Sequence, residues 1–225
     1  MKLNISFLQV MQLISKIISW VFLPLFMPVY ALLLTMYIPS LEKGFFQNNT
    51  IYLLDPRLKL ALLGIFFLFS FLAPAISLVI LKRNNKISNL EIDNRSERSI
   101  PILVTAIYSA ILAWFLMVKT PEGILPPAVY LLPAGGTVAI FLVLLITRID
   151  KISLHALGVG MLMGFLIAYF QTQAQFQLWI LLLVTIVSGV IMFARLYLGK
   201  HNLRQCLMGY FLGMVIIYLT IKVFG

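Results

Sequence analysis

The stretch ARLYLGKHNLRQ, residues 194–205, is a polar island between two long apolar runs near the C-terminus. It holds Arg195 and His201, and His201 is one of only two histidines in the chain. The other, His155, lies in the stretch KISLHA, residues 151–156, which also borders an apolar run. Ionisable groups at membrane depth are costly, so they are kept mainly where they serve a function. The two stretches therefore predict one polar site at a membrane surface.

The composition is that of a membrane protein. Hydrophobic residues make up 62% of the 225 residues and charged residues only 11%, far from the balance of a soluble domain. The net charge is +10, but the basic residues lie in short loops, where lipid head groups and phosphate are the nearest anions. We therefore expect the bilayer and a lipid phosphate as partners, and no nucleic acid. The single cysteine, Cys206, and the two histidines form no metal-ligand pattern, so no metal or other cofactor is expected.

Seven apolar segments approach or exceed the length of about 20 residues that a membrane span needs. They cover roughly residues 14–38, 59–81, 100–118, 126–147, 154–171, 177–194 and 204–222. The fifth and sixth segments belong to one uncharged stretch that a glutamine cluster, residues 171–177, interrupts. The sequence thus predicts an all-α transmembrane bundle of six to seven spans, forming a single integral-membrane domain over residues 1–225.

Two pairs of glycines lie within the fifth and seventh segments. Gly160 and Gly164 form one pair, and Gly209 and Gly213 the other. Small residues four apart let two membrane helices approach closely. Each pair could serve packing in general, or the two pairs could join the fifth and seventh spans to each other beneath the histidines.

An alternating path of seven spans places all the polar motifs on one face. That face carries the N-terminus and the loops 82–99, 148–153 and 195–203. Most of the lysines and arginines also fall there, so the positive-inside rule predicts that this face is cytoplasmic.

The spacing Arg-x5-His-x3-Gln resembles the third motif, Ser-Arg-x5-His-x3-Asp, of the type 2 phosphatidic acid phosphatase family of membrane lipid phosphatases. The resemblance implies that His201 attacks phosphorus to form a phosphohistidine and that Arg195 binds phosphate oxygens. Gln205 stands where the family has the aspartate that orients the histidine, and its neutral amide cannot stabilise an imidazolium as a carboxylate does. The alternative interpretation, without the resemblance, is that Arg195 anchors a span end at the membrane interface and that His201 is a surface histidine.

The other two motifs of the family are only partly present. Ser153 and His155 stand in place of Pro-Ser-Gly-His, which implies that His155 protonates the departing lipid oxygen and that Ser153 binds phosphate. Ser153 is also a credible helix N-cap. Arg95 and Arg98, ahead of Pro101, are the remnant of Lys-x6-Arg-Pro and are carried over as phosphate ligands. A salt-bridged loop with Glu91, Asp93 and Glu97 is the alternative for these two arginines.

The resemblance implies a metal-independent, integral-membrane lipid phosphatase. Its substrate would be a lipid phosphomonoester or pyrophosphate of the phosphatidic acid, phosphatidylglycerophosphate or polyprenyl pyrophosphate class. The alternative, which Gln205 favours, is a catalytically weak relative that binds or transports a lipid phosphate. The expected location is the bacterial inner membrane, with the site cytoplasmic by charge count and periplasmic by family analogy. The sequence leaves the oligomeric state open.

Overall fold

The computed structural model describes residues 7–41, 43, 50–90 and 94–225. Over these residues the chain is helical, without strands, and seven helical segments are long and apolar enough to cross a membrane. The predicted all-α membrane bundle is therefore confirmed, and the chain is an integral membrane protein. Each of the seven expected segments falls on one of these helical segments.

Prolines break the first two helical segments. The first consists of α1 (Phe7–Val21), a 3-10 turn at Pro24–Phe26, and α2 (Met27–Tyr37). The second consists of α3 (Pro56–Phe66), a π-helix at Phe67–Leu72, and α4 (Ala73–Arg83). Proline has no backbone N–H to donate within a regular helix, and the π-helix ends two residues before Pro74. The two breaks meet where the rings of Phe26 and Phe71 stack with centroids 4.0 Å apart.

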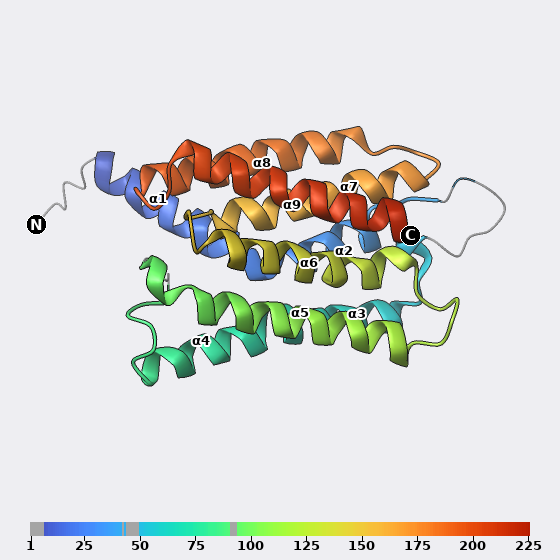
Figure 1. Ribbon diagram of the computed structural model, residues 1–225. Helices are drawn as coiled ribbons and strands as arrows, with labels where there is room; N and C mark the ends of the chain where they lie inside the picture. The colour runs from blue at the N-terminus through green and yellow to red at the C-terminus, as the bar shows by residue number, and fades with distance from the viewer. Residues whose placement is uncertain (1–6, 42, 44–49, 91–93) are drawn as a thin grey trace, which may run out of the picture.

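The remaining five helices are continuous. They are α5 (Ser99–Lys119), α6 (Pro127–Ile146), α7 (Leu154–Thr172), α8 (Leu178–Tyr197) and α9 (Leu203–Phe224). Figure 1 shows them side by side, with α3, α4 and α5 in one layer and the other helices in a second. The glutamine cluster that interrupts the apolar stretch marks the connection between α7 and α8, where residues 173–177 are not helical.

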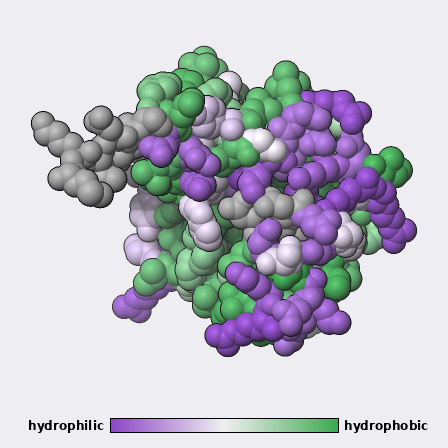
Figure 2. Space-filling model, turned by 90° about the vertical axis from the view of Figure 1, so that its left-hand side faces the viewer, coloured by the Kyte–Doolittle hydropathy of each residue, from purple (hydrophilic) through white to green (hydrophobic). Residues whose placement is uncertain are grey.

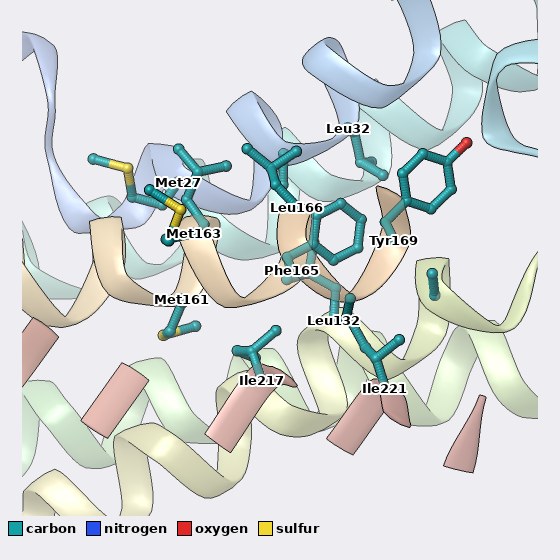
Figure 3. Close-up of a cluster of buried hydrophobic side chains, with 14 of the residues drawn as sticks. Met27, Leu32, Leu132, Met161, Met163, Phe165, Leu166, Tyr169, Ile217 and Ile221 are labelled. Atoms are coloured by element: carbon teal, nitrogen blue, oxygen red, sulfur yellow. The ribbon is translucent and has the colours of Figure 1, made fainter. Parts of the chain in front are cut away.

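Helix α7 is buried along nearly all of its length and forms the centre of the molecule. Its side chains Phe165, Leu166 and Tyr169 pack against Leu32 of α2 and Leu132 of α6, in the core shown in Figure 3. At its far end, the Tyr169 hydroxyl accepts a hydrogen bond from the Ile51 backbone N–H at 3.0 Å. A central helix held along its whole length gives the groups at its N-terminus a fixed position.

The glycine pairs join α7 directly to α9. A Cβ atom on Gly160 would lie 2.0 Å from the Tyr210 carbonyl oxygen, and one on Gly164 would lie 2.2 Å from that of Met214. From the other side, a Cβ on Gly213 would lie 2.3 Å from the Leu157 carbonyl oxygen. Of the two alternatives for the glycine pairs, the structure therefore shows the one in which they join the fifth and seventh spans to each other, because the two backbones touch at these positions.

The loops that carry the polar motifs gather at one end of the bundle. Residues 84–90 and 94–98, residues 147–153 and residues 198–202 all lie at the left-hand end in Figure 1, near the start of α1. Figure 2 looks onto this end and shows hydrophilic residues crowded over it. The exposed bases among the described residues there include Lys82, Arg83, Lys86, Arg148 and Arg204.

Candidate active site

A cavity of about 410 Å³ opens at this polar end of the bundle. Its polar lining includes Lys16 and Ser19 of α1, Arg98 just before α5, His155 of α7, Arg195 of α8, and His201 between α8 and α9. Deeper in, its walls are apolar and come from the 3-10 turn at Pro24–Phe26, the π-helix, α4, α5, α6 and α7. Four of the residues singled out in the sequence, from three stretches far apart along the chain, thus border one cavity.

The end of α8 explains the spacing between Arg195 and His201. Arg195 lies in the last turn of α8, and Gly199 follows with a positive φ of 62°. Residues with a side chain rarely adopt this conformation, whereas glycine does so readily. The conformation of Gly199 turns the chain so that the Lys200 N–H donates to the Arg195 carbonyl at 3.1 Å. The chain reverses there, so His201 returns to the cavity just before α9 begins.

The start of α9 fixes His201. Asn202 is the N-cap, and its side chain accepts from the Gln205 N–H while the Gln205 side chain accepts from the Asn202 N–H, a capping box. The Gln205 Oε1 atom also lies 3.2 Å from His201 Nδ1. An amide oxygen can only accept, so His201 carries its proton on Nδ1. Its Nε2 lone pair is then available as a nucleophile.

His201 lies in a strongly positive environment. Its side chain is 9% exposed. Burial first, and then the charges of Arg98, Lys151 and Arg195, lower the pKa of His201 from 6.5 to about 3. The imidazole is therefore neutral at physiological pH, the form that can attack phosphorus. The same cations favour an anion in the cavity.

Arg195 and His155 share one partner on α1. Arg195 is buried and donates to the Ser19 Oγ at 3.2 Å, and the Ser19 carbonyl oxygen lies 3.0 Å from His155 Nε2. Because a carbonyl only accepts, His155 holds its proton on Nε2. Sequence reasoning missed Ser19. The signal in the sequence was the pair Ser15 and Ser19, two hydroxyls four residues apart at the start of the first apolar segment; the structure shows both to be buried.

Arg95 and Arg98, the two arginines before α5, differ in whether they line the cavity. Arg98 is buried, lines the cavity, and donates to the Ile152 carbonyl at 3.1 Å. Arg95 is not among the lining residues, and its guanidinium donates instead to the carbonyls of Thr147 and Arg148. Both arginines thus attach the start of α5 to the turn between α6 and α7.

The sequence left a salt-bridged loop with three acidic residues as the alternative for Arg95 and Arg98. Glu91 and Asp93 lie outside the described residues. The Glu97 carboxylate accepts from the backbone N–H and the hydroxyl of Ser88, at 2.6 and 2.9 Å. These bonds close the loop between α4 and α5 on itself.

Ser153 caps α7. Its Oγ accepts from the Ala156 N–H at 3.4 Å, its backbone N–H donates to the Gln205 carbonyl at 3.3 Å, and the side chain is fully buried. It does not line the cavity. The capping alternative is the one that the geometry supports, and its effect is to fix the start of α7 beside that of α9.

One further polar residue of the site was missed. Asp150, in the turn before α7, lies 3.5 Å from the Gln205 Nε2 atom through its Oδ1. Its signal was a lone carboxylate between Arg148 and Lys151, in a loop already assigned to the site.

Comparison with known proteins gives one match. The family model of the PAP2 superfamily matches residues 65–225, which is more than two thirds of the chain. No curated protein and no solved structure matches the chain. The matched region contains His155, Arg195 and His201, and it excludes α1 with Ser19.

Proposed function

We propose that this chain, which belongs to the PAP2 superfamily as the sequence motifs predicted, is a membrane phosphatase acting on a lipid phosphate. One observation carries the proposal. A single cavity joins a cationic, imidazole-containing end to long apolar walls. The first part suits a phosphate and the second suits a hydrocarbon chain.

The polar end has the groups that phosphoryl transfer needs. The guanidinium groups of Arg98 and Arg195 match phosphate oxygens in shape and charge and would stabilise the transition state. His201 Nε2 would attack phosphorus, forming the N–P bond as the bond from phosphorus to the lipid oxygen breaks. His155, protonated in the substrate complex, would give its proton to that leaving oxygen. Water would then hydrolyse the phosphohistidine and release inorganic phosphate.

The apolar part of the cavity has the dimensions of a lipid tail. Along α5 the lining residues run from Arg98 to Leu112, a distance of about 21 Å at 1.5 Å per residue. One leaflet of a bilayer has a hydrocarbon depth of about 15 Å. A lipid held by its phosphate at Arg98 could therefore keep the first part of its chain inside the protein.

A second function is favoured by one residue. Gln205 replaces the carboxylate that orients the histidine in the family, and loss of such a carboxylate in a serine protease triad costs about ten-thousand-fold in turnover. A protein that binds or transports a lipid phosphate without cleaving it would retain the cavity and its arginines. The arrangement of His201, with Nε2 free for attack, favours the phosphatase.

The test is phosphate release by the purified full chain in lipid nanodiscs with EDTA present. The panel is phosphatidic acid, phosphatidylglycerophosphate and undecaprenyl pyrophosphate. We expect release from at least one of them, and its loss in His201→Gln. Binding of the lipids without any release of phosphate would support the binding protein instead.

A further inference from the structure

We propose that Asp150 is a positioning residue for His201 and that it acts through the side-chain amide of Gln205. Asp150 lies in the turn between α6 and α7, about 50 residues before His201 and Gln205 of the stretch 194–205. Its catalytic consequence rests on the proposed phosphatase function. Its effect on the imidazole of His201 does not.

Three side chains form a connected chain of hydrogen bonds. His201 Nδ1 lies 3.2 Å from Gln205 Oε1, and Gln205 Nε2 lies 3.5 Å from Asp150 Oδ1. The orientation of the amide is fixed from both sides. Its oxygen also accepts the Asn202 N–H at 3.3 Å, and its nitrogen faces an acceptor that has no proton to give. With the amide fixed, His201 has only an acceptor to face and must hold its proton on Nδ1.

Asp150 is itself held in place as an anion. Its Oδ1 accepts from the Lys151 N–H at 2.7 Å, and its Oδ2 accepts from Arg204 at 2.6 Å. The Lys151 N–H first, and then the charge of Arg204, keep the pKa of Asp150 below its usual value. Arg95 holds the turn through the carbonyls of Thr147 and Arg148. The carboxylate therefore keeps its charge and its position near Gln205.

The carboxylate would compensate for the neutral residue at position 205. An anion at the amide N–H polarises the amide and makes its oxygen a stronger acceptor, since connected hydrogen bonds reinforce each other. That stronger acceptor matters when His201 becomes positive during phosphoryl transfer, because Arg98, Lys151 and Arg195 all oppose its charge. The long 3.5 Å contact is expected to shorten at that moment, as catalytic hydrogen bonds do.

The direct readout is the tautomer of His201, measured by NMR with ¹⁵N-labelled histidine in the full chain in nanodiscs. A His155→Gln variant identifies the His201 signals. We expect the native chain to show the Nδ1–H tautomer at pH 7. In Asp150→Asn the amide of residue 150 offers a donor as well as an acceptor, Gln205 can turn over, and the tautomer mixture should shift toward Nε2–H.

A double-mutant cycle separates action through Gln205 from a general loss of structure. Gln205→Met keeps the length of the side chain and removes its hydrogen bonds to His201, Asn202 and Asp150, so adding Asp150→Asn should change the tautomer no further. If Asp150 acted only by holding Arg204, its replacement would still have an effect in this background. Glu122→Gln, in the loop between α5 and α6, removes one carboxylate at a distance from these contacts and should leave the tautomer unchanged.

In the phosphatase assay we expect Asp150→Asn to lower kcat about 10-fold with little change in KM, the lower end of the loss seen when a carboxylate that orients a metal-ligating histidine is removed. An unchanged tautomer in Asp150→Asn would overturn the proposal, and so would an equal effect with and without Gln205. If Gln205→Met fails to fold, an unchanged tautomer in Asp150→Asn alone still overturns the proposal. If no lipid releases phosphate, the proposed function fails, while the tautomer measurement still decides the role of Asp150.

Discussion

Replacement of Gly160 by alanine should force α7 and α9 apart. The new Cβ would lie 2.0 Å from the Tyr210 carbonyl oxygen, and ordinary contact begins at 3.4 Å. Because the opposing atom belongs to the backbone, no side-chain rotation can relieve the clash. The helices would have to separate by about 1.4 Å, or the chain would have to pay a strain of about 1–3 kcal/mol typical of overpacked cores.

The separation should also reduce activity. His155 lies near the start of α7 and His201 directly precedes α9, so a movement between these helices displaces one histidine relative to the other. A misplacement of about 1 Å costs about 100-fold in rate when the reacting groups are held in place by the protein. We therefore expect Gly160→Ala to unfold at a lower temperature and to release phosphate about 100-fold more slowly.

Gly189→Ala is the matched control, measured by the same phosphate-release and thermal-unfolding assays in nanodiscs. Gly189 lies on the exposed face of α8, and a Cβ atom there would meet nothing within 4 Å. Both variants gain the same helix propensity, about 1 kcal/mol for glycine to alanine, so their difference isolates the contact with α9. If Gly160→Ala were as stable and as active as Gly189→Ala, the role given to the glycine contact would be wrong.

Three further predictions concern the cavity. His201→Gln should abolish phosphate release while Lys200→Gln, one residue away, changes it less than threefold; equal losses would leave only a basic surface. NMR titration should find His201 neutral down to about pH 4, with a pKa that rises when bound inorganic phosphate offsets the nearby cations. Because histidine in the unfolded chain takes up a proton near pH 6.5, His201 should lower the unfolding temperature as the pH falls from 6.5 toward 3. Thr105→Phe, in the apolar wall, should slow release from long-chain lipids more than from short-chain ones; an equal slowing would argue against a tail in this cavity.

The sequence by itself determined the class of fold and the local part of the site. The lengths of the apolar runs predict the seven membrane helices, because a bilayer admits few other structures for so apolar a chain. The relation between Arg195 and His201 is also local, since a helix end, Gly199 and a capping box lie within a few residues of each other. The glycine pairs pointed to α7 and α9 because only small residues permit such an approach.

Only the tertiary structure decided which polar groups meet. Arg95 and Arg98 look alike in sequence, yet one donates to carbonyls of a neighbouring turn and the other lines the cavity. Ser19 and Asp150 enter the site from helices and turns far from His201 along the chain, and nothing in their local spacing fixes those contacts. Local patterns specify helices and caps, whereas the packing of one helix on another selects the partners of a side chain. For that reason the hydrogen bond to the Ser19 carbonyl, which determines where His155 holds its proton, follows from the folded structure alone, whereas the contact of His201 with Gln205, four residues on, is local.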